Sequence, residues 1–246
     1  MGRNAGASAE DRRLAELFAR IGLAYDSEHA LILGEKIAKF LTAEAWAASA
    51  MLGARRGSFP AFADSVWPSR GFTALRNAAL TCVAPTGTIS LIAGTSSAIE
   101  PFFALALARR VLDGRLLTEL NPLVAAELDR LGRNAKAREL VLRHGSLSHA
   151  PNLPPELRRR FPIALEIAPE WHLRMQAAFQ NHMDAAVSKT VNLPQDAPRS
   201  AVREIFTQAR RLHLKGVTVY RYGSRAGQTL SYIEEAARPD CRECAV

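Results

Sequence analysis

Residues 76–103 read RNAALTCVAPTGTISLIAGTSSAIEPFF, a segment that passes from an apolar run into a turn rich in glycine and hydroxyl groups. The apolar run extends from Ala78 to Ala84 and predicts a short buried strand. Pro85 ends this strand, because proline has no N–H to donate to a neighbouring strand. Cys82 lies within the run, so the sequence predicts an unreactive core thiol at that position.

The turn that follows has the composition of an anion-binding site. Glycine lets a ligand approach the backbone closely, and hydroxyl groups can donate further hydrogen bonds. A helix is predicted to continue through Leu91, and the first N–H groups of a helix lack internal acceptors and carry partial positive charge. For the turn alone, an ordinary capped turn is the alternative interpretation. The predicted phosphate-binding residues are Pro85, Thr86, Gly87, Thr88, Ile89 and Ser90.

Hydrophobic periodicity and turn residues divide the rest of the chain into elements. Residues 58–71 are expected to form a loop packed by its own aromatic side chains, and Ser96 and Ser97 are expected to cap a helix. Helices are predicted at residues 11–21, 27–56, 104–111, 116–131, 134–144, 169–186 and 198–212. Further strands are predicted at residues 163–168, 190–193 and 216–220. The alternation of strand and helix in the second half predicts parallel strands with crossover helices, and therefore an α/β fold.

The composition favours anionic partners. The 246 residues include 32 Lys and Arg against 24 Asp and Glu, a net charge of +8, which suits phosphates, nucleic acid or an acidic protein surface. A solvated basic surface is the alternative. The arginines are dispersed with few aromatic residues among them, so a dedicated nucleic-acid groove is not predicted. No apolar stretch has the length of a membrane span and no signal-peptide core precedes the first helix, so we expect a cytoplasmic protein.

Four motifs follow one another along the chain: PTGTIS at 85–90, AGTSSAIEPFFAL at 93–105, AVSKTVNLP at 186–194 and KGVTVYRYGSR at 215–225. Together they resemble the C-terminal part of the large subunit of the adenosylcobalamin-dependent (class II) ribonucleotide reductases. The resemblance runs from about Leu14 to the final Cys-Arg-Glu-Cys.

This resemblance implies the C-terminal half of a ten-stranded α/β barrel, with added helices. Such a half cannot close alone, so its edge strands need a partner. Three regions are expected: a disordered N-terminus at residues 1–10, the half-barrel at 11–235 and a flexible redox tail at 236–246.

The resemblance also implies roles for individual residues. Residues 85–90 would bind the phosphates of a ribonucleotide, and Ser188, Lys189 and Asn192 would form a wall beside the substrate. Lys189 could pair with phosphate or with a carboxylate, and a plain surface lysine is the third interpretation. The family commonly has glycine where this chain has Ala98. His144 and His149 lack further ligands at metal-binding spacing, so no metal site is predicted.

The radical chemistry of the family needs residues that this sequence lacks. Family members carry Asn-x-Cys-x-Glu, in which the cysteine becomes a thiyl radical, and this motif does not occur in the printed sequence. Cys241 and Cys244 form the candidate dithiol, which in the family carries electrons to a buried disulfide. Half of a zinc site and a tail without function are the alternatives.

The sequence therefore predicts a reductase segment that is inactive alone, either a gene fragment or one half of a split enzyme. The implied cofactor is adenosylcobalamin. The implied partners are a ribonucleotide, a thioredoxin-like reductant, and either the missing N-terminal half or a second copy of the chain. A non-catalytic nucleotide-binding or assembly partner of another reductase chain is the alternative function, and a basic nucleic-acid-associated protein is a third. The choice between diphosphate and triphosphate substrates stays open.

Overall fold

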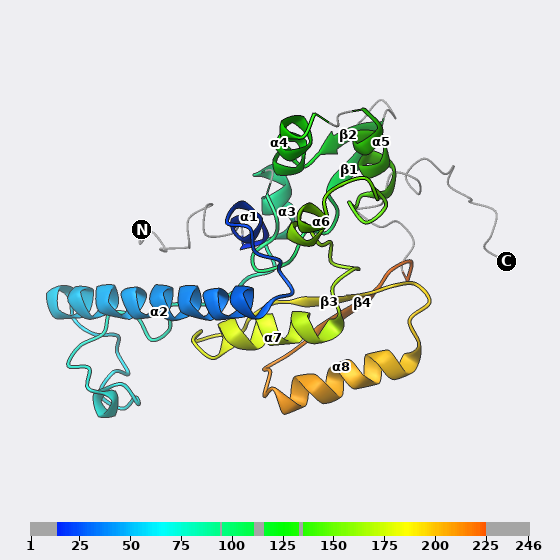
Figure 1. Cartoon of the computed structure of the whole chain (residues 1–246). Coiled ribbons are helices and arrows are strands. Elements are labelled where there is room, and N and C mark those ends of the chain that lie inside the picture. The colour runs from blue at the N-terminus through cyan, green and yellow to red at the C-terminus, as the bar shows by residue number, and fades with distance from the viewer. Residues whose placement is uncertain (1–13, 94, 111–115, 133–134, 225–246) are drawn as a thin grey trace.

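The computed structural model combines helices with two small sheets (Figure 1) and describes residues 14–93, 95–110, 116–132 and 135–224. In chain order the helices are α1 (Leu14–Arg20), α2 (Glu28–Arg56), the 3-10 helix η2 (Pro68–Arg70), α3 (Gly87–Ile92), α4 (Pro122–Arg130), α5 (Ala135–His144), α6 (Pro155–Arg160), α7 (Pro169–Gln180) and α8 (Arg199–Arg211). The strands are β1 (Ala106–Arg110), β2 (Leu116–Leu120), β3 (Thr190–Leu193) and β4 (Thr218–Arg221).

The two N-terminal helices form where the sequence predicts them. The hydroxyl oxygen of Ser27 accepts a hydrogen bond from the N–H of Ala30 (3.2 Å) and caps the start of α2. Gly57 follows its last residue with a φ of 82°, which glycine adopts without a side-chain clash. Figure 1 shows the C-terminal half of α2 extending well beyond the other elements.

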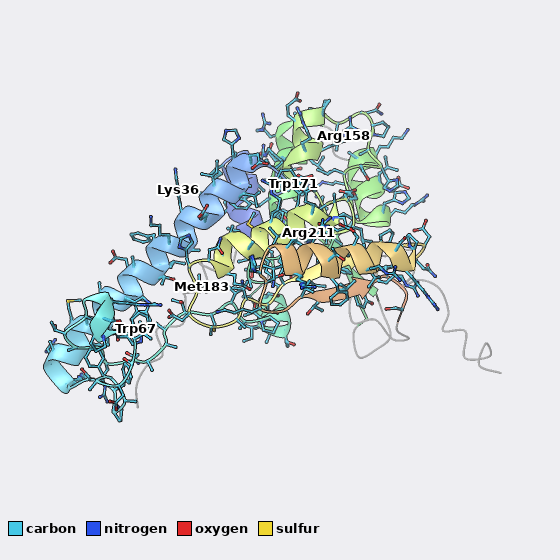
Figure 2. The ribbon with its side chains drawn as sticks, turned by 90° about the horizontal axis from the view of Figure 1, so that it is seen from below. Lys36, Trp67, Arg158, Trp171, Met183 and Arg211 are labelled. Carbon is cyan, nitrogen blue, oxygen red and sulfur yellow. The ribbon has the colours of Figure 1, made fainter. Side chains whose placement is uncertain are left out.

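The loop after α2 packs two of its own aromatic residues together, Phe59 and Phe62 (5.6 Å between ring centroids), as predicted, and it also packs against Trp46 of α2. The ring centroids of Trp46 and Trp67 lie 4.0 Å apart, and Phe72 meets Trp67 edge-on at 5.7 Å. Figure 2 shows Trp67 at the end of α2 that is far from α7 and α8. The aromatic cluster therefore gives this projecting end a small core of its own.

The predicted helices over 104–111 and 116–131 are wrong in part. Strands β1 and β2 form an antiparallel hairpin in which Ala106 pairs with Leu120, and only α4 is helical in the second segment. Alanine, leucine and arginine favour helix locally, but pairing and burial override that preference. Asn121 then caps α4 by accepting a hydrogen bond from Leu123 N–H (2.9 Å). Helix α5 matches its prediction, whereas the short helix α6 was not predicted.

The C-terminal sheet follows the expected topology. Strands β3 and β4 are parallel, with Thr190 paired to Thr218 and Leu193 paired to Arg221, and α8 is the crossover between them. Helices α7 and α8 lie on the same side of this sheet in Figure 1. An α/β chain with parallel strands is thus confirmed in the part of the molecule that holds the motifs at 186–194 and 215–225.

Two predicted strands are reduced to single bridges. Within 78–84 only Val83 pairs, in a parallel bridge to Val187, and within 163–168 only Ile163 pairs, with Phe102. Because residues 78–84 have a neighbouring strand segment on one side only among the described residues, Cys82 is exposed and the prediction of a core thiol is wrong. Helix α7 ends at Gln180 instead of continuing to 186, since the chain then extends to pair with residues 81–83.

The buried side chains form three groups among the described residues. One group, around Phe161, joins α1, α4, α5 and α6, and a second, around Met175 and Phe179, joins α2 to α7. A third, around Val191 and Ile205, lies between the β3–β4 sheet and helices α7 and α8. Within the described residues, no helix is both long enough and apolar enough to cross a membrane.

Candidate functional site

The glycine- and hydroxyl-rich turn opens helix α3, so its residues belong to the first helical turn. The Ser90 N–H donates to the Thr86 carbonyl (2.9 Å), the first bond of the helix. The N–H groups of Gly87, Thr88 and Ile89 have no acceptor among the residues that the structure describes. All three residues are exposed. The turn therefore presents consecutive backbone donors to solvent.

Space is left above these donors. A Cβ atom built on Gly87 would meet no heavy atom within 4 Å. The Ser90 hydroxyl donates to the Gly87 carbonyl (2.7 Å) and is buried, so it fixes the shape of the turn. The backbone at Gly87 is thus open on its Cβ side, as expected of an anion-binding turn.

A second turn holds the first in place. The Ser97 hydroxyl donates to the Pro85 carbonyl (3.2 Å) and lies 3.3 Å from the Thr86 hydroxyl. Glu16 of α1 is buried, and its carboxylate accepts the N–H of Ser96 (2.6 Å) and the Ser96 hydroxyl. No helix begins at Ser96 or Ser97, so the predicted cap is wrong; Ser97 instead contacts the turn at Pro85 and Thr86, and Ser96 is held by Glu16.

The residues of the predicted wall lie on strand β3 and just before it. Side chains alternate along this segment, with Ser188 and Asn192 half-buried on one face and Lys189 and Val191 buried on the other. Val187 pairs with Val83, so Ser188 shares a face with Cys82. Ser188 and Asn192 thus lie on the open face of the sheet. Cys82, in the segment before the glycine-rich turn, lies on the same face.

Lys189 occupies a buried polar cluster, so the interpretation as a surface lysine is wrong. It is 1% exposed, and its ammonium donates to the Glu100 carboxylate (2.5 Å), to His172 Nδ1 (2.9 Å) and to the Thr190 carbonyl (3.2 Å). An ammonium has three N–H groups, and each has an acceptor here. The pairing with a carboxylate, one of the predicted alternatives, is confirmed.

The neighbours of Lys189 complete this cluster. The Ala164 carbonyl can only accept, so His172 Nε2 carries the hydrogen of that contact (3.1 Å) and Nδ1 accepts from Lys189. The ring of Tyr25 lies 5.8 Å from the Lys189 ammonium. The Tyr25 hydroxyl donates to the Ile99 carbonyl (2.5 Å), next to Glu100.

Burial controls the protonation of the cluster. Desolvation, together with the positive charge of Lys189, lowers the pKa of His172 to about 3, so the imidazole is neutral. Burial lowers the pKa of Lys189 from its usual value, while the Glu100 carboxylate opposes that shift. Burial and the Glu100 charge raise the pKa of Tyr25 well above 10.0, so the phenol stays protonated. The cluster therefore holds one ion pair between two neutral rings.

Sequence reasoning missed Glu100, His172 and Tyr25. The signal available for Glu100 was its position between Ile99 and Pro101 in an apolar run, where a carboxylate needs a partner. For Lys189 the signal was the alternation of β3, which assigns it to the buried side. Their pairing joins residues that are 89 positions apart and could not be read from local spacing.

Three further sequence features concern the cysteines, two histidines and Ala98. Cys241 and Cys244 lie outside the described residues. The rings of His144 and His149 stack at 4.4 Å, and no group of metal-binding side chains occurs among the described residues. Ala98 has a φ of 43°, a left-handed conformation in which glycine is favoured over alanine.

Comparison with known proteins places these features in a family. The family model described as "Ribonucleotide reductase, barrel domain" matches residues 12–74 and 72–220. A vitamin B12-dependent ribonucleoside-diphosphate reductase of Mycobacterium tuberculosis (strain ATCC 25618 / H37Rv) is 51% identical over 224 residues, covering 89% of this chain and 31% of that protein. The protein of the same name from Thermoplasma acidophilum is 41% identical over 231 residues, covering 93% of this chain and 30% of that protein.

Solved structures agree at the level of the fold. The class Id ribonucleotide reductase alpha subunit of Actinobacillus ureae superposes with a TM-score of 0.72 at 22% identity, covering 86% of this chain and 38% of that one. The chain spans about a third of the length of the curated relatives that it matches.

Proposed function

The chain belongs to the ribonucleotide reductase barrel-domain family, and from this premise we propose that it is the substrate-phosphate-binding segment of a vitamin B12-dependent reductase. Such an enzyme converts ribonucleotides into deoxyribonucleotides, the precursors of DNA. Two similar relatives are named ribonucleoside-diphosphate reductases, which favours a nucleoside diphosphate as the ligand.

The observation that carries this proposal is the row of backbone donors at Gly87, Thr88 and Ile89, which have no acceptor among the described residues. A diphosphate would accept hydrogen bonds from these amides, and the exposed Thr88 hydroxyl would add another. The buried contact between Glu16 and Ser96 holds the supporting turn without the ligand, so the donors are already in place before binding.

The open face of the sheet would contact the rest of the nucleotide. Ser188 and Asn192 offer a hydroxyl and an amide on that face, both able to donate to and accept from ribose or base. Lys189 supports this wall from the buried side, because its ammonium has no N–H left for a phosphate. We therefore assign substrate contact to Ser188 and Asn192 only.

Turnover would need parts that this segment does not provide. The sequence has no Asn-x-Cys-x-Glu, so we propose that the thiyl radical forms on another part of a longer protein or on a partner chain. Cys241 and Cys244 would then pass electrons from a thioredoxin-like reductant to the active-site disulfide. A non-catalytic nucleotide-binding partner is the second candidate, and it too rests on the missing radical motif.

The cleft beside α5 does not fit adenosylcobalamin. This cleft of about 370 Å³ between α5 and the following loop lies at the low end of the roughly 300–1,000 Å³ of pockets for drug-sized ligands. A corrin with its nucleotide arm is far larger, and the lining of this cleft has no histidine, cysteine or carboxylate. We therefore assign no residue of this segment to the cofactor.

The test is nucleotide binding to Gly87→Val. The new side chain would enter open space in the free protein but would meet a phosphate bound at the amides, so affinity for cytidine 5′-diphosphate should fall at least tenfold in calorimetry, while the thermal unfolding midpoint stays within a few degrees. Gly216→Val is the matched control, because a Cβ there also meets nothing within 4 Å. Equal affinity of Gly87→Val and the original chain would exclude this turn as the site.

A further inference from the structure

We propose that Lys189 is a positioning residue that holds the phosphate-binding turn in register with the wall strand β3, an inference that rests on the proposed function of those two parts. Lys189 does not reach the ligand itself. Its side chain points to the buried face of β3, opposite to Ser188 and Asn192, and its three N–H groups are bonded within the protein. It acts through Glu100.

Glu100 joins the wall to the turn. One oxygen of its carboxylate accepts the N–H of Thr190 (2.7 Å) and the other accepts from Lys189 (2.5 Å), so two consecutive residues of the strand are fixed to one side chain. On the other side, the Glu100 N–H donates to the Ser97 carbonyl (2.7 Å), and the Ser97 hydroxyl donates to the Pro85 carbonyl (3.2 Å). A continuous path of hydrogen bonds therefore connects Lys189 to the first residue of the phosphate turn.

The backbone between these contacts is adapted to the same purpose. Ala98 lies between Ser97 and Glu100 with a φ of 43°, which is unfavourable for an alanine. The conformation persists because the neighbouring bonds define it, and residues held in such conformations cluster at functional sites. The reversal at Ala98 lets Ser97 face the phosphate turn while Glu100 faces Lys189.

Stability alone does not explain a fully buried lysine. Removing two charges from water offsets most of their mutual attraction, and apolar pairs of similar size often stabilise a protein as well or better. The ion pair adds geometric specificity, because Lys189 donates to Glu100, His172 and the Thr190 carbonyl at the same time and so fixes their relative positions. That arrangement sets the distance from the amides of the turn to the open face of β3.

The experiment separates positioning from phosphate binding by using two ligands. Inorganic pyrophosphate would contact only the turn, whereas cytidine 5′-diphosphate would contact both the turn and the wall. Two variants leave the net charge of the pair at zero, so that neither changes the field at the phosphate: the double variant Lys189→Met with Glu100→Gln, and Glu100→Asp, whose shorter side chain cannot serve both Lys189 and Thr190. If the double variant does not fold, Glu100→Asp decides the question.

In calorimetry, we expect both variants to bind cytidine 5′-diphosphate about tenfold more weakly and pyrophosphate within twofold of the original chain. Lys36→Met is the control, since Lys36 is exposed on α2 and projects away from the protein (Figure 2), and it should change neither affinity. A parallel loss of both ligands, or unchanged nucleotide binding, would overturn the positioning role. If the original chain binds neither ligand, the proposed phosphate site itself falls, and the inference with it.

Discussion

Ala98 has a backbone conformation that its side chain disfavours. Its φ of 43° brings Cβ close to the following carbonyl, at a cost of about 1–2 kcal/mol. Ala98→Gly removes this strain, although glycine loses more chain entropy on folding, so we expect a net gain of about 0.5–1 kcal/mol in the free energy of unfolding. Urea denaturation followed by circular dichroism measures the change.

The matched control is Ala104→Gly. Ala98 and Ala104 are each 9% exposed, but Ala104 has no positive φ. Glycine at 104 removes a methyl group and relieves nothing, so it should lower the free energy of unfolding by about 1 kcal/mol. A loss of stability in both variants would show that the backbone at Ala98 is not strained.

His172 gives the protein a pH dependence of known sign. Burial lowers its pKa to about 3 in the folded state, whereas an unfolded histidine has a pKa near 6.5. Between these values the unfolded chain binds a proton that the folded chain does not, so stability falls as the pH drops from about 6.5 towards 3, by at most about 1.4 kcal/mol per pH unit. Urea midpoints measured at several pH values should show this slope, and it should become shallower in His172→Gln.

The site was predictable at the residue scale only where chemistry is local. Thr86, Gly87 and Ser90 could be singled out because a glycine and hydroxyls after a proline favour an anion-binding turn, and their contact with phosphate stays a prediction. Glu100 could not, because its partner Lys189 is distant in sequence, and a carboxylate before Pro101 looks like the first turn of a helix. Burial, which decides the role of both charges, is a property of the folded chain.

At the scale of elements, the segment before the phosphate turn depends on Asp184. Its carboxylate accepts the N–H groups of Leu80 (2.9 Å) and Thr81 (3.1 Å), the Thr81 hydroxyl (3.2 Å) and the indole N–H of Trp46 (3.2 Å). One side chain thus fixes the segment to both α2 and the chain after α7.

Removing this carboxylate should loosen the segment. Asp184→Ala leaves four donors without their acceptor, and we expect a loss of about 2–3 kcal/mol in the free energy of unfolding, since single hydrogen bonds to charged groups contribute about 1.5–3 kcal/mol. Asp184→Asn retains one oxygen as an acceptor and should lose less. Guanidinium denaturation of both variants checks this order, and equal stability of Asp184→Ala and the original chain would contradict it.

Elements were predictable where pattern and burial agree. Ser27 and Gly57 bracket α2, and the apolar alternation of β3 matches its buried face, so both elements appear where the sequence predicts them. The β1–β2 hairpin was read as helix, because residues 104–111 favour helix locally and only the pairing of Ala106 with Leu120 makes them strands. Helix propensity gives the wrong prediction where pairing with another segment determines the conformation.

At the scale of the whole molecule, the sheet that holds β3 has open edges within the described residues. Among the described residues, β3 and β4 form a sheet of two strands, extended only by the bridge from Val187 to Val83. Edges of this kind have unpaired N–H and C=O groups and seek further strands. We therefore expect this chain alone to produce no deoxyribonucleotide, as measured by chromatography of the nucleosides after incubation with adenosylcobalamin and dithiothreitol.

Adding the missing part should restore turnover. The complementary segment of a relative that carries Asn-x-Cys-x-Glu should yield deoxyribonucleotide when it is mixed with this chain under the same conditions. In that mixture Cys241→Ser should abolish turnover with thioredoxin as the reductant but spare turnover with dithiothreitol, which reaches the buried disulfide directly. If the mixture is inactive while the chain alone binds nucleotide, the non-catalytic binding partner is the better function.

The far end of α2 shows how the loop after it is closed. The backbone of Leu75 and Arg76 passes so near Gly53 that an added Cβ would come within 3 Å of it, and the Arg76 N–H donates to the Ser49 carbonyl (3.0 Å). These contacts close the loop of residues 57–75 against α2. We therefore expect insertions or deletions at the tip of this loop to leave the rest of the fold unchanged, because the contacts at Gly53 and Ser49 separate the tip from the other elements.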